Sequence, residues 1–219
     1  MSSDPISSRQ GEYRRREIVS VAIDVFGEFG FAGARIDEVA RRVGIRRPSV
    51  LYHFPDKRQL YQAAIAQVVH GIAEQIHKSA DLPGERLEAI ADAWIDFVIQ
   101  GPNAARLLLR QMIDSDPIQI QSTLPAIQAI FDTIAVALEE QDGPGTAKPI
   151  DVGEFALVLA SISLVWVSSR DAVEGALGID TLAPQAIQRH RRMLRTLMRQ
   201  QWNAALVAAA DAPSDLADD

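Results

Sequence analysis

The segment that most constrains the fold is residues 36–60, which read IDEVARRVGIRRPSVLYHFPDKRQL. Val39 and Val43 are four residues apart, so they share one face of a short helix. Gly44 follows, where helices commonly end on a residue with a left-handed backbone conformation. Val50 comes six residues later, on a second short helix that can pack back onto the first. This spacing predicts a helix-turn-helix motif whose second helix is free to enter a DNA major groove.

A proline marks the start of the second short helix. Pro48 fixes its own φ and disfavours the helical region for the residue before it. We therefore expect Arg47 to be the N-terminal cap and Pro48 to be the first helical position, where the missing N–H costs little. Pro55 ends the helix, and Asp56 is placed to cap the long helix that follows.

The exposed side of this second helix, with its flanks, carries the residues expected at DNA. They are Arg35, Arg46, Arg47, Pro48, Ser49, Tyr52, His53 and Lys57. Base contacts are expected from Arg47 and Ser49, with Tyr52 as a further candidate. The side chains of Arg35, His53 and Lys57 are better placed for phosphates, which fix register without reading sequence. Two alternatives stay open. Arg46 contacts either a base or a phosphate, and the Tyr52 ring packs under the helix with only its hydroxyl reaching the backbone.

The distribution of charge supports a polyanionic partner for the N-terminal part. The whole chain has a formal net charge of −7, which by itself argues against DNA binding. Residues 1–60, however, hold eleven Lys or Arg against eight Asp or Glu, whereas the remainder holds eleven against twenty-one. A basic end on an acidic body directs polyanion binding to one face. The alternative is that these basic clusters are only solvated helix faces. The helix-turn-helix pattern makes this alternative the weaker one.

Residues 15–60 resemble the DNA-binding domain of the tetracycline-repressor (TetR) family of transcriptional regulators. The matching pieces, in chain order, are Phe26-Gly27-Glu28-Phe29-Gly30-Phe31, Ile36-Asp37-Glu38-Val39-Ala40, Val43-Gly44-Ile45 and Leu51-Tyr52-His53-Phe54, followed by Lys57. The close match covers about a fifth of the chain, and the rest resembles the family only in being helical and of similar length. The resemblance implies a DNA-binding regulator of transcription, most commonly a repressor.

The chain departs from the family pattern at four positions of this segment. Ala34 and Arg35 stand where the family commonly has two threonines, Arg46 stands in place of a serine cap, and Pro48 replaces glycine or another small residue. Because the lost hydroxyls are phosphate contacts or caps in relatives, we expect Arg35 and Arg46 to supply charge instead. With these departures we still expect DNA binding, but the target sequence does not follow from the resemblance.

Hydrophobic periodicity predicts an all-α fold of about nine helices and no strand. We expect a disordered N-terminal arm over residues 1–10, a helix-turn-helix DNA-binding domain over 11–56, a helical effector-binding and dimerisation domain over 57–210, and an acidic tail over 211–219. The longer helices are expected at 11–30, 56–80, 84–100, 104–113, 119 or 124 to 141, 151–174 and 184–210.

A single recognition helix reads too few base pairs to define a site in a genome, so we expect a homodimer on a palindromic operator. The segment 155–167 is apolar almost all round, which predicts burial on several sides. TetR relatives dimerise through a four-helix bundle of their last two helices, and by analogy the last two helices serve here. The dimer candidates are Phe155, Leu159, Ile162, Trp166, Leu194, Leu197, Met198 and Trp202. The alternative is that these side chains serve only the chain's own core.

In TetR relatives the helical body encloses a cavity for a small-molecule effector that releases DNA, and the long helix over 56–80 is the natural lever. The effector candidates are Trp94, Phe97, Leu108, Met112, Ile130, Ile134, Ser161 and Trp166. The set is apolar with few charges, which favours a small apolar or aromatic effector. An ordinary core role is the alternative for each of these residues.

The remaining motifs favour no enzyme. One Glu-x-x-His pair, Glu74 and His77, is present, whereas di-iron four-helix proteins need two such pairs. The chain has no cysteine and no phosphate-binding glycine motif, so we expect no cofactor, no metal and no thiol chemistry. The N-terminus lacks the apolar run of a signal peptide, and we expect a cytoplasmic protein with no membrane partner. The alternatives left open are a helical DNA-binding protein without an effector and a helical metal-dependent enzyme.

Overall fold

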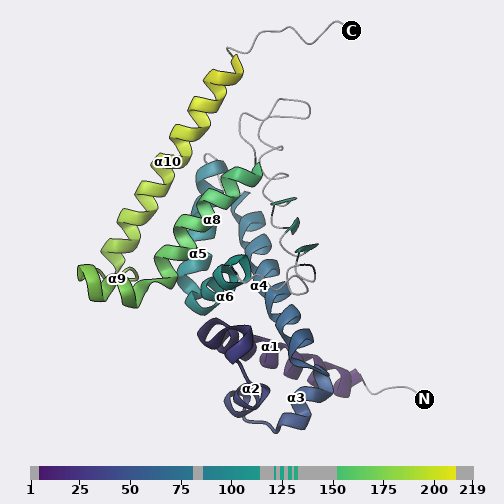
Figure 1. Cartoon of the computed structure of the whole chain (residues 1–219). Helices are drawn as coiled ribbons and strands as arrows, with labels where there is room; N and C mark the ends of the chain where they lie inside the picture. Colours follow the sequence, from purple (N-terminus) through teal and green to yellow (C-terminus); the bar gives the residue numbers. More distant parts are fainter. Residues whose placement is uncertain are drawn as a thin grey trace, which may run out of the picture. The chain divides into compact units, whose positions relative to one another are not determined.

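A computed structural model describes residues 5–80, 86–113, 121, 124–125, 128–129, 131–132 and 152–210. These residues form nine α-helices and no strand, which confirms the all-α prediction (Figure 1). The chain divides into two compact units, residues 1–71 with 100–128 and residues 72–99 with 129–219. The helix expected from residue 119 or 124 to 141 lies largely outside the described residues, and the tail over 211–219 lies wholly outside them.

The first unit is built from α1 (Pro5–Gly33), α2 (Ile36–Val43), α3 (Arg47–His53), the start of α4 (Lys57–Ala80) and α6 (Pro102–Ile113). α1 begins six residues earlier than predicted, so residues 5–10 are helical and not a disordered arm. Pro5 fits the first turn of a helix, where its missing N–H has no intrahelical partner to lose. The inclusion of α6 shows that this compact unit is larger than a helix-turn-helix domain ending at residue 56.

Two glycines set the directions of the helices in this unit. Gly30 has φ 68° and ψ 174°, which interrupts α1 at the residue predicted to stop it. Gly44 has φ 76° and ψ 29°, and its left-handed conformation ends α2 as the sequence predicts. The N–H of Ile45 then donates to the carbonyl of Ala40 at 2.9 Å. Because an L side chain is strained at such φ values, both turns require glycine.

The core of the first unit lies under α1. Ile18, Ala22, Val25 and Phe26 are almost fully buried, as their spacing predicts, whereas Phe29 is half exposed. An aromatic cluster joins distant segments, since the ring centroids of Phe26 and Tyr61 are 5.0 Å apart and those of Phe31 and Tyr61 are 5.1 Å apart. These contacts fix the start of α4 against α1.

α6 packs against α1 at very short range. A Cβ placed on Gly27 would lie 2.3 Å from the carbonyl oxygen of Asn103, so only glycine allows this approach. The Asn103 side-chain amide donates to Asp24 at 2.9 Å, and Arg110 Nε donates to the Gly27 carbonyl at 3.4 Å. The Tyr61 hydroxyl and the Gln111 side chain form a further, buried hydrogen bond of 2.9 Å.

The second unit holds α5 (Arg86–Gln100), α8 (Val152–Ser168), α9 (Arg170–Leu177) and α10 (Pro184–Ala210), together with the end of α4. α8 and α10 run in opposite directions and are joined through α9 (Figure 1). Among the described helices no single one is long and apolar enough to cross a membrane, and only the bent pair α8 and α9 reaches the required length and composition together.

The single helix predicted over 151–174 is instead two helices that meet at 67°. The break falls at Ser169, whose backbone has φ −91° and ψ 12° and whose hydroxyl donates to the Val165 carbonyl at 2.6 Å. Serine side chains compete with backbone hydrogen bonding in this way, and periodicity alone does not reveal it. The Arg170 guanidinium pairs with Asp180 through contacts of 2.8 and 3.0 Å, which holds the turn after α9.

Ion pairs link α5 to α10 within the second unit. Arg191 Nη1 donates to Asp92 at 3.1 Å and Arg195 Nε donates to the same carboxylate at 3.0 Å. Arg191 also pairs with Asp96, and Arg199 pairs with Glu88. The partners recur at four-residue steps along both helices, so Arg191, Arg195 and Arg199 are each paired within the unit.

Candidate nucleic-acid interface

The recognition helix α3 begins one residue earlier than predicted. Arg46, with φ −85° and ψ 148°, is the N-terminal cap, and Arg47 is the first helical residue, so the prediction of Arg47 as the cap is wrong. The Ser49 N–H donates to the Arg46 carbonyl at 2.9 Å, which closes the first turn. The restriction before proline is a preference, and here the first turn overcomes it.

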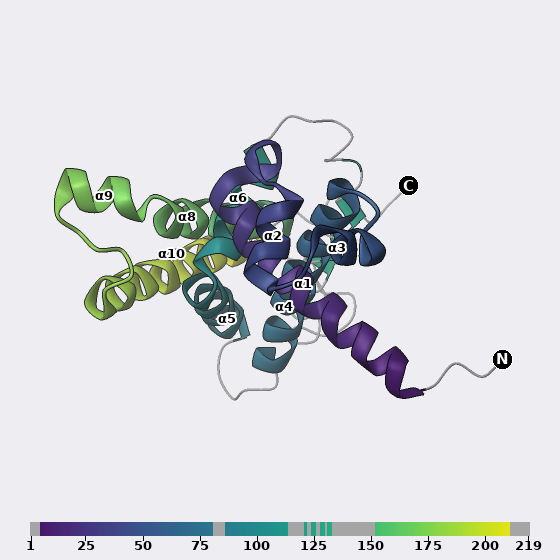
Figure 2. The same ribbon diagram turned by 90° about the horizontal axis from the view of Figure 1, so that it is seen from below.

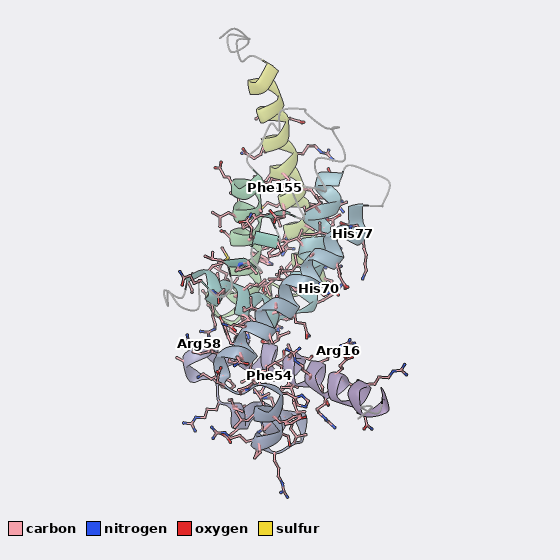
Figure 3. All side chains as sticks on the ribbon, turned by 90° about the vertical axis from the view of Figure 1, so that its right-hand side faces the viewer. Arg16, Phe54, Arg58, His70, His77 and Phe155 are labelled. Atoms are coloured by element: carbon pink, nitrogen blue, oxygen red, sulfur yellow. The ribbon has the colours of Figure 1, made fainter. Side chains whose placement is uncertain are left out.

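Two buried side chains hold α3 on the unit. Val50 is fully buried and Phe54 is 2% exposed, as their positions in the motif predict. The Arg15 guanidinium lies 4.8 Å from the centre of the Phe54 ring, in a cation–π contact. Figure 3 labels Phe54 at the end of α3. Since packing uses these positions, the other side of α3 is left for a partner.

The outward side of α3 carries the residues predicted to read DNA. Arg46, Arg47, Pro48 and Ser49 are exposed, and Tyr52 is 85% exposed. The exposure of Tyr52 removes the alternative in which its ring packs under the helix. These five side chains are therefore all accessible to a partner.

Acidic neighbours hold some of the basic side chains near this surface. Arg47 Nη1 lies 3.4 Å from the Asp37 carboxylate, and both side chains are more than half exposed. Arg41 and Arg42 both pair with Glu38 at 2.6 Å. Hydrogen bonds from Arg41 and then Arg42 lower the pKa of Glu38 from 4.5 to about 2. Arg42 also pairs with Glu28 at 2.7 Å, so the two carboxylates balance the charges of Arg41 and Arg42 within the protein.

Lys57 occupies a different position from the one expected of a phosphate contact. Its ammonium donates to the carbonyls of Ala32 and Ala34 at 3.3 and 3.0 Å and lies 4.7 Å from the centre of the Phe31 ring. These contacts tie the segment between α1 and α2 to the start of α4. Arg35, at the exposed N-terminal cap of α2, remains placed for a phosphate.

A hollow of about 480 Å³ lies beside the recognition helix. Its lining is Arg14, Ile45, Pro48, Ser49, Tyr52 and His53. Arg14 and Ile45 were absent from the predicted interface. The signal for Arg14 was available, because it lies four residues before the buried Ile18 and so faces the same side of α1. In Figure 2 the first turns of α1 extend beyond α2 and α3.

The predicted effector residues fall in both compact units. Trp94 and Phe97 on α5 have stacked rings with centroids 6.5 Å apart, and Trp94 is buried. Trp166 stacks on His190 at 4.7 Å and donates from Nε1 to the Thr181 carbonyl at 3.2 Å. The other placements are Leu108 buried and Met112 exposed on α6, Ser161 exposed on α8, and Ile130 and Ile134 outside the described residues.

Half of the predicted dimer residues belong to the chain's own core. Phe155, Leu159, Leu194 and Met198 are each less than 5% exposed, which leaves them no surface to offer to a second copy. Packing within one chain buries only part of the segment 155–167, because one side of α8 is exposed. Three further candidates, Ile162, Trp166 and Leu197, are partly exposed, and the side chain of Trp202 lies outside the described residues.

The geometry of α2, the Gly44 turn and α3 defines a helix-turn-helix DNA-binding protein. The model of the family described as "Bacterial regulatory proteins, tetR family" matches residues 18–64. TtgW, an uncharacterized HTH-type transcriptional regulator of Pseudomonas putida, is 30% identical over 111 residues, which cover 49% of this chain and 81% of TtgW. The chain belongs to the tetR family of bacterial regulatory proteins and is a DNA-binding transcriptional regulator.

Two more comparisons extend beyond the DNA-binding part. RutR, an HTH-type transcriptional regulator of Escherichia coli (strain K12), is 23% identical over 177 residues, which cover 80% of this chain and 81% of RutR. The crystal structure of FadR from Bacillus subtilis in complex with stearoyl-CoA has a TM-score of 0.63 at 14% identity and covers 82% of this chain and 96% of that one. The fold is therefore shared over most of the chain, and the relatives are transcriptional regulators.

Proposed function

We propose that this regulator binds a palindromic operator in the cytoplasm as a homodimer and represses transcription until a small apolar or aromatic effector releases it. The observation that carries the proposal is the separation of buried and exposed residues on α3. Val50 and Phe54 are buried, whereas Arg47, Ser49 and Tyr52 are exposed. In functional terms we assign DNA reading to residues 11–56 and effector binding with dimerisation to residues 57–210.

Reading is assigned to the outward side of α3. Arg47 and Ser49 are placed to reach base edges, with Tyr52 as a further base contact. His53 and Arg35 are assigned to phosphates. Lys57 is reassigned from a phosphate contact to a positioning role, because its ammonium already binds two carbonyls. Arg46, as the exposed cap beside Arg47, serves either a base or a phosphate.

The dimer surface is reassigned from the buried candidates to the exposed side of α8. Leu157, Val158, Ser161 and Val165 lie on this side, and the apolar members are 43 to 51% exposed. Met193 adds an exposed apolar side chain from α10. A contiguous apolar side of this kind on a water-exposed helix is typical of a protein–protein interface.

The exposed side of α8 is symmetric about Ser161. Leu157 precedes Ser161 by four residues and Val165 follows it by four, so each lies one helical turn away. Two antiparallel copies of α8 that cross at Ser161 place Leu157 of each copy against Val165 of the other. A two-fold interface requires this self-complementarity, and a small residue at the crossing permits close approach.

The chain has no cysteine, which makes this arrangement directly testable. With Ser161→Cys, two copies should form a disulfide under mild oxidation, because the crossing brings the two Cα atoms within the roughly 4–7 Å that a disulfide needs. Ser20→Cys, at an exposed position on α1, is the matched control and should remain uncrosslinked. Equal crosslinking of the two variants at low protein concentration would refute the crossing.

The effector proposal rests on the aromatic side chains of the second unit. Trp94 and Phe97 on α5 and Trp166 on α8 supply large apolar surfaces. The buried Trp94 Nε1 has no hydrogen-bond partner among the described residues, so a ligand acceptor is one group that would satisfy it. FadR, which shares this fold, was crystallised with stearoyl-CoA, and that supports a ligand role for such a body.

The operator is tested first and the effector second. Genomic fragments retained by the purified protein should share an inverted repeat, with half-sites about 34–36 Å or a multiple of that distance apart. An effector from a metabolite library should then raise the melting temperature of the protein and release the selected duplex. Retained fragments without an inverted repeat would contradict the homodimeric reading. Stabilising compounds that never release DNA would favour a regulator without an effector.

A further inference from the structure

The hollow between α1 and α3 has a composition suited to one part of duplex DNA. We infer that it is a phosphodiester-binding site in which Arg14 binds a backbone phosphate beside the half-site read by α3. This inference rests on the proposed operator binding and extends the contact to a helix segment that precedes the family match at residue 18.

Arg14 is held at the hollow with donors to spare. Its Nη1 atom lies 2.6 Å from the Glu17 carboxylate, and its side chain is 44% exposed. A guanidinium carries five N–H donors in a planar fork, so one ion pair leaves others for a phosphate. Glu17, one turn further along α1, thereby orients the Arg14 side chain without occupying all of it.

The rest of the lining matches the groups next to a phosphate. Ile45 and Pro48 supply an apolar surface for deoxyribose carbons, and the imidazole of His53, already assigned to a phosphate, lies beside them. When a recognition helix lies in the major groove, its flanks face the sugar–phosphate strands that border the groove. The hollow lies on such a flank, so a backbone unit fits it better than a base edge does.

The three consecutive arginines of α1 differ in what they contact, which supplies matched controls. Arg14 lines the hollow, and Arg15 stacks on the Phe54 ring within the unit. Arg16 is two residues beyond Arg14, about 200° around the helix, so the two side chains leave opposite sides of α1. Figure 3 labels Arg16 on α1. Only Arg14 is therefore expected to have a specific phosphate partner.

The test compares Arg14→Ala with Arg16→Ala on a random-sequence duplex and on a duplex selected by the wild-type protein. Binding is measured by fluorescence anisotropy between about 50 and 200 mM KCl. Each phosphate contact makes the slope of log K against log salt more negative by about 0.9, so Arg14→Ala should reduce the magnitude of the slope by about 0.9 for each chain bound. Arg16→Ala should stay near the wild-type slope, and Arg14→Lys should recover part of the loss. Thermal melting confirms that all variants are folded.

A second measurement separates a direct contact from a change of structure. Single phosphates of the selected duplex are replaced in turn by neutral methylphosphonates. The wild-type protein should lose affinity at one position per half-site at which Arg14→Ala loses none. Equal slopes for Arg14→Ala and Arg16→Ala, or the same methylphosphonate pattern in wild type and Arg14→Ala, would overturn the inference while operator binding stands. Failure of the wild-type protein to bind any duplex would instead refute the proposed function.

Discussion

The close approach of α1 and α6 gives the sharpest prediction for stability. In Gly27→Ala, the new Cβ would lie 2.3 Å from the Asn103 carbonyl oxygen, 2.9 Å from its carbonyl carbon and 3.0 Å from its Cα. Ordinary contact begins at 3.4 Å, so the oxygen is about 1.1 Å too close. All three atoms belong to the backbone, so no side-chain rotation relieves the overlap and the two helices must separate.

The size of the effect follows from two opposing terms. Overpacking of this kind costs about 1–3 kcal/mol, and separation also weakens the hydrogen bonds of Asn103 and Arg110 to α1. Replacing a helical glycine with alanine returns up to about 1 kcal/mol. We therefore expect the free energy of unfolding to fall by about 1–2 kcal/mol. For a chain of this size that corresponds to a melting temperature lower by about 2–8 °C.

A second glycine of α1 serves as the control. A Cβ added at Gly11 would meet no atom within 4 Å, so Gly11→Ala should keep the propensity gain and raise the melting temperature by about 1–4 °C. Both variants are melted at one protein concentration by circular dichroism, because association shifts apparent stability. If Gly27→Ala melts as high as Gly11→Ala, α1 and α6 do not approach as described.

Three further predictions concern charge and burial. Hydrogen bonds from neighbouring arginines lower the pKa of Glu38 from 4.5 to about 2, so the stabilisation present above pH 4.5 should be lost as the pH falls towards 2. In Glu38→Gln the melting temperature should fall less across that interval, and an equal fall would refute the assignment. Lys57→Met should lower the melting temperature by about 2–4 °C, because two hydrogen bonds worth about 1 kcal/mol together are lost, while the salt slope of DNA binding stays unchanged. Burial lowers the pKa of His190 below 6.5, so stability should decrease as the pH falls below 6.5, where the unfolded chain binds a proton that the folded chain does not. His190→Gln should flatten this dependence in pH-dependent melting, whereas the exposed His77→Gln should retain it.

The sequence was most informative where structure is local. The Gly44 turn, the buried Val50 and the Asp56 cap depend on neighbours within one or two helical turns, and each is found as predicted. Asp56 Oδ1 accepts from the Gln59 N–H at 2.8 Å, as a capping side chain should. The ends of α4 and α10 were also predicted to within about a residue, because proline or a run of loop residues borders them.

Features that depend on distant partners were missed. Periodicity identified α8 as apolar on every side but did not show which side the chain itself covers, so Phe155 and Leu159 were assigned to a dimer surface they do not reach. The break at Ser169 depends on a serine hydroxyl and on the Arg170–Asp180 pair across a turn. The Lys57 ammonium was assigned to phosphate because its carbonyl partners lie more than twenty residues earlier in the chain.

On the recognition helix, the buried positions that hold it on the unit differ from the positions proposed to contact DNA. This separation affects how the regulator can evolve. Substitutions at Arg47, Ser49 or Tyr52 remove no buried surface, so on the proposed assignment they would alter operator preference at little cost to folding. Substitutions at Val50 or Phe54 would disturb the core whatever DNA is bound. Single substitutions at Arg47, Ser49 or Tyr52 should therefore give folded variants with new operator preferences. These three positions are the ones to randomise when the protein is redirected to a chosen promoter.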